Sequence, residues 1–301
     1  MSVLFLFIDG VGLAEEGAYN PLVRPEWEAF DRLTNGSGLI PLEKPVQTDQ
    51  LSFFSVDANL GVEGLPQSGT GQASLFSGEN AARIAGRHFG PYPHSKTKAL
   101  LKERSLFHQA GKMGYSTHFI NAYPDIFFKE MNRRNRWTCT TLMASSAGQQ
   151  LNGLEEVQRG VSVTAEIIQD AWREKLNLDV PEIEPETAAE RVIRAAENYD
   201  LVLYEYYLTD KAGHRRDREM SQRLLTTLNR FLVYILDHME SDMYLVLCSD
   251  HGNLEDLSVK THTRNPVPMI IFGNGGNQTE RADSIMDLPG VILSLLEGSK
   301  I

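Results

Sequence analysis

One stretch decides how the rest of the chain is interpreted: Pro66-Gln67-Ser68-Gly69-Thr70-Gly71-Gln72-Ala73-Ser74-Leu75-Phe76-Ser77-Gly78. Its glycines allow the backbone to turn sharply and to approach a ligand closely. The small and apolar residues predict a helix, and a helix that begins just after Ser68 would point free N–H groups at an anion beside that hydroxyl. Ser68 is therefore a candidate nucleophile for a phosphate or sulfate ester, provided that its pKa is lowered. The alternative is a simple strand-to-helix turn in which Ser68 is only the N-cap.

Length and composition narrow the class of protein. The 301 residues allow one large domain, or one with a modest insertion. A net charge of −11 argues against non-specific binding to nucleic acid or to an anionic membrane. Two cysteines are too few for a disulfide scaffold. The apolar run of residues 3–8 is too short for a secretion signal and lacks its basic flank, and no run reaches transmembrane length. We therefore expect a cytoplasmic protein.

Strands and helices are expected to alternate along the chain. The apolar run of residues 3–8 is typical of a buried strand in a parallel sheet. Further strands are expected at residues 116–121, 201–207, 244–248 and 269–272, and helices at residues 27–33, 68–85, 97–112, 163–176, 187–199, 217–239 and 287–296. Apart from one helix, residues 13–65 are expected to form loops, and residues 187–190 fit a capping box. This alternation predicts an α/β sandwich.

Side chains of the kinds that bind metals occur at four places just past a predicted strand. They are Asp9, Asp210 with His214, Asp250 with His251, and His262. Asp210 and His214 are four residues apart, so both can reach one ion from a helical turn or a compact loop. Asp250 and His251 are adjacent and can bind one ion from a turn, or two neighbouring ions. Mixed aspartate and histidine ligands suit zinc or manganese. Taken singly, each could also be a surface histidine, a loop acid or a strand-end cap.

Five motifs of the chain occur together in one known family. They are Asp9-Gly10, Ser68-Gly69-Thr70-Gly71-Gln72, Asp210 with His214, Asp250-His251-Gly252-Asn253, and His262-Thr263-Arg264-Asn265-Pro266-Val267-Pro268. The set resembles the alkaline phosphatase superfamily, most closely the branch that contains cofactor-independent phosphoglycerate mutase and phosphopentomutase. The resemblance covers about residues 1–90 and 200–297. It implies a three-layer α/β/α sandwich around a mostly parallel sheet, with residues 1–301 as a single domain and a possible small cap at about residues 123–178.

The resemblance also implies a centre with two divalent metal ions, Mn²⁺ or Zn²⁺. One ion would be bound by Asp210, His214 and His262, and the other by Asp9, Asp250, His251 and the oxygen of Ser68. The positive charge of two such ions exceeds the negative charge of three aspartates, which favours a serine alkoxide and a phosphoryl dianion. Ser68 is preferred to Thr70 as the nucleophile because Gly78 stands ten residues after it. That register is similar to the one that follows the modified cysteine of sulfatases.

Two departures from the mutase pattern favour a hydrolase. Gln72 stands where the mutases have a histidine, and residues 95–201 leave room for only a small cap in place of the large second domain of phosphoglycerate mutases. We therefore expect a phosphomonoester hydrolase that acts through a Ser68 phosphoenzyme on a small phosphorylated substrate. A small phosphomutase, a phosphodiesterase and a non-catalytic metal-binding module are the alternatives. Arg87, Lys96 and Arg264 are candidate cations for the substrate, although ordinary surface charge also explains each of them.

Overall fold

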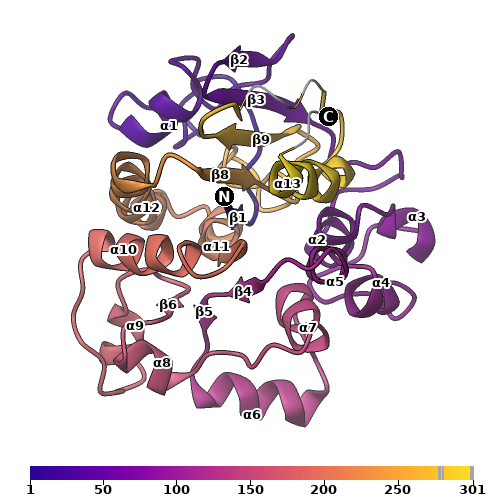
Figure 1. Cartoon of the computed structure of the whole chain (residues 1–301). Coiled ribbons are helices and arrows are strands. Elements are labelled where there is room, and N and C mark those ends of the chain that lie inside the picture. The colour runs from indigo at the N-terminus through magenta and orange to yellow at the C-terminus, as the bar shows by residue number, and fades with distance from the viewer. Residues whose placement is uncertain (277–278, 280, 299–301) are drawn as a thin grey trace.

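A seven-stranded sheet forms the centre of the molecule (Figure 1). The computed structural model describes residues 1–276, 279 and 281–298. The strand order is β2-β3-β9-β8-β1-β7-β4, with bounds Val46–Thr48, Leu51–Val56, Val267–Phe272, Met243–Cys248, Ser2–Ile8, Leu201–Tyr206 and Thr117–Phe119 in that order. Strands β8, β1, β7 and β4 are parallel, whereas β9, β3 and β2 are each antiparallel to the preceding strand. The expected strands at residues 3–8, 201–207, 244–248 and 269–272 are confirmed.

Helices cover both faces of this sheet. In Figure 1, α1, α10 and α12 lie on one side of the strands, α2, α5 and α13 lie on the other, and α6 to α9 lie beyond β4. The helix bounds are α1 Glu28–Leu33, α2 Ser68–Ser77, α3 Ala81–Ala85, α4 Lys98–Glu103, α5 Leu106–Lys112, α6 Asp125–Arg134, α7 Cys139–Ser146, α8 Leu154–Gln158, α9 Asp170–Glu174, α10 Pro185–Ala196, α11 Leu208–Arg215, α12 Arg218–His238 and α13 Leu288–Glu297. Among the described helices, none combines the length and the apolar character that crossing a bilayer requires.

Strand β1 lies in the middle of the sheet and is buried on both faces. Every one of its residues is buried, and alternate side chains enter two different cores. Phe5 and Phe7 belong to the core on the α2 side, where Phe76 packs edge-on against Phe7 with 5.4 Å between ring centroids. Leu4 and Leu6 belong to the core on the side of α10 and α12. Burial on both faces explains why residues 3–8 of this strand are all apolar. The predicted three-layer α/β/α sandwich is confirmed.

Two expected helices are each divided into shorter ones. Residues 68–85 form α2 and α3, because Gly78 ends α2 in a left-handed conformation with a φ of 78°. Residues 97–112 form α4 and α5, which are separated by Arg104 and by Ser105 in an extended conformation. The prediction of helical structure is therefore confirmed in both segments, whereas the prediction of one continuous helix is wrong in each.

Other predictions of secondary structure are wrong. Residues 13–65 contain β2 and β3 as well as the expected helix α1. Residues 163–176 contain β6 (Val163–Thr164) and only the short helix α9, and β6 pairs with β5 (Asn121–Ala122) in a separate two-stranded sheet. The expected strand at residues 116–121 is accordingly split between β4 and β5. Helix α10 begins at Pro185, two residues before the expected capping box, and its N-cap is Glu184.

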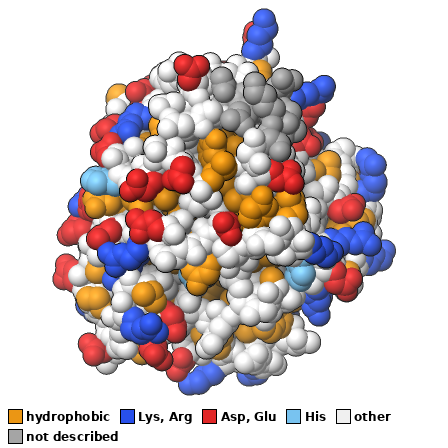
Figure 2. All heavy atoms as spheres, viewed as in Figure 1, with side chains coloured by type: hydrophobic (Ala, Val, Ile, Leu, Met, Phe, Trp, Pro, Cys, Tyr) orange, Lys and Arg blue, Asp and Glu red, His pale blue; other side chains and the backbone are white. Residues whose placement is uncertain are grey.

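Charged side chains are unevenly distributed over the surface. Figure 2 shows acidic side chains concentrated on the left of the face seen in Figure 1, and a group of Lys and Arg side chains on its right. On this face, the acidic excess of the chain is therefore not evenly spread, and the local charge differs from the net charge of the protein.

Candidate metal centre and catalytic cavity

The predicted ligands converge at the carboxyl ends of the three central strands. Asp9 directly follows β1, Asp210 and His214 lie on α11 after β7, and Asp250 and His251 follow β8. His262 comes from the loop between β8 and β9. Because β7, β1 and β8 are neighbouring parallel strands, residues from distant parts of the chain meet at one edge of the sheet.

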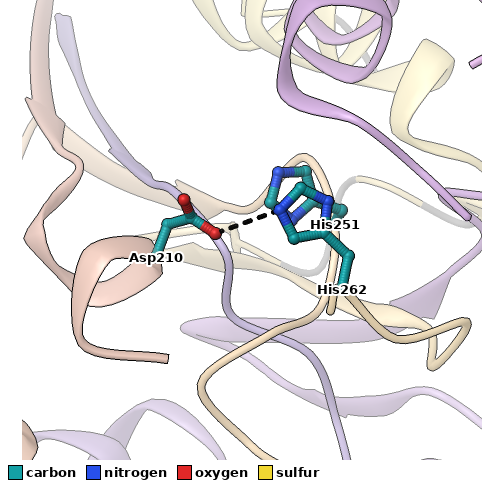
Figure 3. Close-up of side chains that lie close together, drawn as sticks. All are labelled: Asp210, His251 and His262. Atoms are coloured by element: carbon teal, nitrogen blue, oxygen red, sulfur yellow. Dashed lines mark ion pairs between the residues drawn. The ribbon is translucent and has the colours of Figure 1, made fainter. Parts of the chain in front are cut away.

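One group of side chains surrounds Asp210. The Nε2 atom of His214 lies 3.3 Å from Oδ2 of Asp210, and Nε2 of His262 lies 3.4 Å from Oδ1 of Asp210. The Nε2 atoms of His214 and His262 are 3.0 Å apart. Figure 3 shows Asp210 pointing at the imidazole of His262, which stacks on that of His251 with 3.8 Å between ring centroids. The three predicted ligands Asp210, His214 and His262 are thus brought together.

A second group surrounds Nε2 of His251. This atom lies 3.4 Å from Oδ1 of Asp9 and 3.5 Å from Oδ2 of Asp250. The hydroxyl of Ser68 lies 3.0 Å from the same nitrogen. All four residues are buried. Ligand atoms of Asp9, Asp250 and His251 lie within 4.8 Å of one another, as do those of Asp210, His251 and His262, so His251 joins the two groups.

Buried polar atoms without partners show that this donor set fits a cation. Oδ1 of Asp9, Oδ2 of Asp250 and Nδ1 of His251 make no hydrogen bond to the described residues. Burial and the repulsion of nearby carboxylates raise the pKa of Asp9 well above its usual value and that of Asp250 to about 7. Burial and the neighbouring His262 lower the pKa of His251 to about 3, so its imidazole is neutral and can coordinate. Carboxylates crowded in this way are the natural ligands of divalent metal ions.

Backbone carbonyls orient two of the imidazoles. Nδ1 of His262 lies 2.7 Å from the carbonyl oxygen of Pro66, and Nδ1 of His214 lies 2.8 Å from that of Lys260. A carbonyl only accepts hydrogen bonds, so each Nδ1 carries a proton and each Nε2 is the atom turned toward Asp210. The contact with Asp210 raises the pKa of His214 to about 9, and a bound cation would replace the proton at its Nε2. The sequence analysis gave no indication of these contacts, because they join segments that carry no motif.

Ser68 is the first residue of α2, not its N-cap, which is Gln67. The alternative interpretation of Ser68 as a simple N-cap is therefore wrong. The glycines that follow it permit close packing: a Cβ on Gly71 would lie 2.9 Å from the carbonyl oxygen of Asp250, and a Cβ on Gly69 would lie 2.7 Å from that of Phe89. The N-terminal turn of α2 can thus approach the centre with its partial positive charge.

Amide side chains hold two of the carboxylates in place. Nε2 of Gln72 donates to Oδ2 of Asp9 at 3.1 Å. Nδ2 of Asn253 donates to Oδ1 of Asp210 at 2.6 Å. Gln72 therefore occupies a positioning role in this chain at the place where the mutases were expected to carry a histidine. Amides that donate to ligating carboxylates fix their orientation without adding charge.

A cavity of about 340 Å³ opens beside Ser68. Its lining combines Asp9, Ser68, Gln72 and Asp210 with Pro91, Tyr92, Tyr123, Phe127, Thr138, Glu205, Tyr207 and Lys211. The predicted cations Arg87, Lys96 and Arg264 are exposed and are not among the residues that line it. Lys211 is the lining cation, and its position directly after Asp210 is the signal by which it could have been found. The aromatic residues of the wall belong to segments without a motif.

Glu205 is a further buried carboxyl group in this wall. It accepts hydrogen bonds from Thr140 Oγ1 at 2.8 Å and from the hydroxyl of Tyr123 at 3.2 Å. Burial raises its pKa to about 7, although these two hydrogen bonds act in the opposite direction. The sequence analysis treated this residue only as part of a strand, since a single glutamate within an apolar run gives no metal-ligand spacing.

The fold and this cluster define a class of α/β metalloenzymes whose centre is built from aspartate and histidine at the ends of parallel strands. The family model of the Metalloenzyme superfamily matches residues 1–300. The chain belongs to this superfamily. The predicted resemblance to the alkaline phosphatase superfamily and to its phosphoglycerate mutase branch is confirmed by this match together with the relatives below.

Curated relatives include two 2,3-bisphosphoglycerate-independent phosphoglycerate mutases. The Ehrlichia canis protein is 30% identical over 130 residues, which cover 40% of this chain and 26% of the relative. The Pyrococcus furiosus protein is 30% identical over 88 residues, which cover 29% of this chain and 21% of the relative. The chain thus spans about a quarter of the length of the curated relatives it matches.

Solved structures share the whole fold. A protein of Pyrococcus horikoshii aligns with a TM-score of 0.61 and 15% identity over 100% of this chain and 98% of its own. The alkaline phosphatase of the Antarctic bacterium TAB5 aligns with a TM-score of 0.56 and 10% identity over 98% of this chain and 97% of its own. The phosphoglycerate mutase of Leishmania mexicana aligns with a TM-score of 0.50 and 11% identity over 100% of this chain and 96% of its own. At these identities the likeness establishes the fold alone.

Proposed function

We propose that this protein is a metal-dependent phosphoryl-transfer enzyme, and specifically a phosphomonoester hydrolase that acts through a phosphorylated Ser68. The observation that carries the proposal is the place of the Ser68 hydroxyl. It lies 3.0 Å from Nε2 of His251, within the group formed with Asp9 and Asp250, and it also lines the cavity. A hydroxyl in this position can contact both a bound metal ion and a substrate in the cavity.

The proposed ligand sets are those expected from the sequence. Asp210, His214 and His262 would hold one divalent ion, and Asp9, Asp250, His251 and the oxygen of Ser68 would hold the other, with Mn²⁺ or Zn²⁺ as the metal. When bound, the ions would lower the pKa of the serine and offset the charge of the phosphoryl group. The grouping of these side chains supports the proposal.

The chain's own residues divide the remaining work. The Ser68 hydroxyl gives its proton to water, its oxygen forms the new bond to phosphorus as the bond to the leaving alcohol breaks, and that alcohol takes up a proton from water. A second water then cleaves the phosphoserine and releases phosphate. The N–H groups at the start of α2 favour the negative charge that collects beside Ser68. Lys211, at the cavity wall, is placed to attract the anionic substrate.

Residues 123–178 would shield the reaction as a small cap within a single domain. Tyr123, Phe127 and Thr138 from this segment line the cavity, which supports this proposal. Deletion of the segment is expected to broaden substrate preference, and unchanged preference would contradict the shielding role. Arg87, Lys96 and Arg264 remain predictions as substrate contacts. Since all three are exposed, they would meet only a substrate that extends out of the cavity.

A phosphomutase is the second candidate, because the curated relatives are phosphoglycerate mutases. A mutase must retain the transferred group while its substrate turns, whereas a hydrolase need only admit water. The cavity wall offers Lys211 as its cation, and its other large members are aromatic, which is a poor match for a doubly anionic sugar acid. This composition of the cavity wall supports the hydrolase over the mutase, and so does Gln72, which stands where the mutases have a histidine.

The decisive experiment compares Ser68→Ala with Ser95→Ala, an exposed serine in the loop before α4. Wild-type protein loaded with Mn²⁺ or Zn²⁺ is expected to hydrolyse p-nitrophenyl phosphate, and acid quenching should trap phosphate on Ser68. Ser68→Ala is expected to lose at least about 100-fold in kcat, because the covalent route is removed, and Ser95→Ala should match wild type. Retained activity in Ser68→Ala would reject the stated mechanism.

The same preparation separates the alternatives. Phosphorus NMR with a phosphorylated sugar acid should show free phosphate for a hydrolase, and movement of the phosphoryl group without release for a mutase. Preference for bis-p-nitrophenyl phosphate over the monoester would indicate a phosphodiesterase. Absence of turnover together with tight metal binding would indicate the non-catalytic module.

A further inference from the structure

A second cavity, of about 400 Å³, lies beside the edge strand β4 and is lined in part by three arginines. They are Arg191 and Arg194 of α10 and Arg159, the residue that caps the end of α8. Within the described part of the chain, no aspartate or glutamate lines this cavity. The protein has a net charge of −11, yet the Lys, Arg, Asp and Glu side chains that line this cavity are all positive.

Arg191 is the central residue of this cavity because its charge is buried and the acceptors of its hydrogen bonds are neutral. Arg191 is only 8% exposed, and its side chain forms no ion pair with a described residue. Its Nη1 donates to two neutral acceptors, the carbonyl oxygen of Ser162 at 3.0 Å and Oε1 of Gln169 at 2.8 Å. Burial and the nearby Arg194 lower the pKa of Arg191. An anion that binds next to a buried cation in these surroundings stabilises it strongly.

The other edge of the Arg191 guanidinium is free to bind that anion. Its Nε and Nη2 atoms make no hydrogen bond to the described residues, and they lie 3.6 and 3.7 Å from the position that a Cβ on Gly160 would occupy. Gly160 also lines the cavity, so no side chain at this position covers that part of the guanidinium. Two parallel N–H groups on one edge match the oxygens of a phosphate or carboxylate.

The other two arginines of the cavity form ion pairs with exposed glutamates. These pairs compensate the positive charge of the arginines only in part. Nη2 of Arg194 lies 2.7 Å from Oε1 of Glu190, and Nη1 of Arg159 lies 4.0 Å from Oε1 of Glu155. Both acids are more than half exposed, so water screens these pairs strongly. Three arginines and two carboxylates leave a net positive charge at the cavity, and Arg191 is the arginine that forms no ion pair within the described residues.

We propose that this cavity is a binding site for a small oxyanion with two negative charges, such as inorganic phosphate or a phosphate monoester. The Nε–Nη2 edge of Arg191 would bind two of its oxygens, and Arg194 and Arg159 would close over it from the rim. The cavity shares no lining residue with the one beside Ser68, so the site is separate from the proposed catalytic centre. Its occupation would also offset the cost of burying Arg191.

The test titrates metal-loaded, full-length protein with inorganic phosphate in a calorimeter. Arg194→Gln is expected to weaken binding at this site at least tenfold, because it removes a charge at the rim and leaves the hydrogen bonds of Arg191 intact. Arg223→Gln is the matched control: it also ends an exposed i,i+4 pair with a glutamate, on α12, away from the cavity. The control should bind phosphate as wild type does.

A second variant and a second measurement keep the outcome clear. Arg191→Lys retains the charge but loses the paired N–H edge, and it should weaken binding at least tenfold as well. The inhibition constant of phosphate in p-nitrophenyl phosphate hydrolysis should be the same in Arg194→Gln and wild type, because that constant reports only the catalytic centre. Phosphate binding that is identical in wild type and Arg194→Gln would overturn the proposal, even if Arg191→Lys failed to fold. If wild-type protein did not hydrolyse p-nitrophenyl phosphate, the proposed function would be rejected, whereas the proposal of this binding site would be unaffected.

Discussion

The hydrogen bond from Gln72 to Asp9 orients a carboxylate at the centre without adding a charge. We expect Gln72→Leu to weaken the binding of Mn²⁺ or Zn²⁺ by about 10-fold or more, because loss of such an orienting contact commonly has this effect. Nε2 of Gln72 lies 3.1 Å from Oδ2 of Asp9, and Leu has a similar size but no donor. Calorimetric metal titration measures the change. Gln222→Leu, at an exposed position of α12, should bind metal as wild type does, and equal affinity in both variants would contradict the role of Gln72.

His118 gives the protein a predictable dependence on pH. Its ring stacks on Tyr199 with 4.6 Å between centroids, and burial lowers its pKa to about 4. A histidine in an unfolded chain titrates at about 6.5. The unfolded chain therefore takes up a proton that the folded protein does not bind, so this residue lowers the free energy of unfolding as pH falls from about 6.5 to about 4. Above that range it has no such effect.

Urea unfolding at several pH values tests this expectation. The free energy of unfolding should decline less steeply below about pH 6.5 in His118→Gln than in wild type, because glutamine does not titrate. Proton NMR of the His118 ring should also show no titration between about pH 5 and pH 7. A ring that titrates near its ordinary value would show that burial does not keep it neutral.

Single residues also show how far sequence reasoning reaches at the centre. The seven predicted ligand residues meet at one edge of the sheet. Asp9, Asp210 and Asp250 could be found because each follows a strand that is recognisable by its apolar run, whereas Ser68 was found from its glycine-rich motif. Lys211, Tyr123 and Glu205 were missed as cavity residues. Lys211 directly follows a predicted ligand and could have been found, whereas the contacts of Glu205 with Tyr123 and Thr140 join distant segments, and no local pattern encodes such long-range packing.

At the scale of elements, buried strands were the most predictable feature. β1, β7 and β8 are apolar because both of their faces are covered, so their sequences differ clearly from those of loops. The segment 163–176 was predicted as a helix. Ile167 and Gln169 instead have φ values of 71° and 67°, and such left-handed residues interrupt a helix. Tertiary packing overrides local preference at these positions.

Helix α2 must pack closely against neighbouring backbone, and its glycines allow this. A Cβ on Gly69 would lie 2.7 Å from the carbonyl oxygen of Phe89 and closer still to that of Tyr92. We therefore expect Gly69→Ala to displace α2, to lower the melting temperature and to reduce hydrolysis together. Backbone atoms cannot rotate away from the added methyl group as a flexible side chain could.

Gly111→Ala in α5 is the matched control for this helix. A Cβ on Gly111 would have no described atom within 4 Å, and the residue lies inside a helix. Replacement by alanine is expected to stabilise the protein by about 0.5–1 kcal/mol and to leave activity unchanged. Differential scanning calorimetry and the p-nitrophenyl phosphate assay measure both effects. A Gly69→Ala protein that melts and reacts as wild type does would show that α2 tolerates displacement.

At the scale of the whole molecule, we expect a metal bound at this centre to stabilise the fold as well. Asp9, Asp250 and Asp210 converge there, and the first two are buried with oxygen atoms that have no partner among the described residues. Removal of divalent ions should leave these carboxylates to repel one another, so the melting temperature is expected to fall. An ion present at about 100 times its dissociation constant contributes about 2.7 kcal/mol to the free energy of unfolding.

Calorimetry before and after treatment with a chelator tests this expectation. Addition of Mn²⁺ or Zn²⁺ should restore the melting temperature of wild type, whereas Asp250→Asn should respond much less, because it lacks one of the proposed ligand charges. If chelation left the melting temperature of wild type unchanged, the centre would make no contribution to stability and the proposed ligand sets would be in doubt.

The central position of β1 has a consequence for how the protein is made. Val3 pairs with Leu201 of β7 and with Tyr244 of β8. The first strand therefore has no strand partner in the sheet until β7, about 200 residues later, has left the ribosome. At about 5–20 residues per second, that interval is roughly 10–40 seconds. Throughout it, a nascent chain carries an unpaired apolar strand of the kind that chaperones recognise. Slow translation or chaperone depletion should therefore lower the yield of native protein before it alters any property of the finished enzyme.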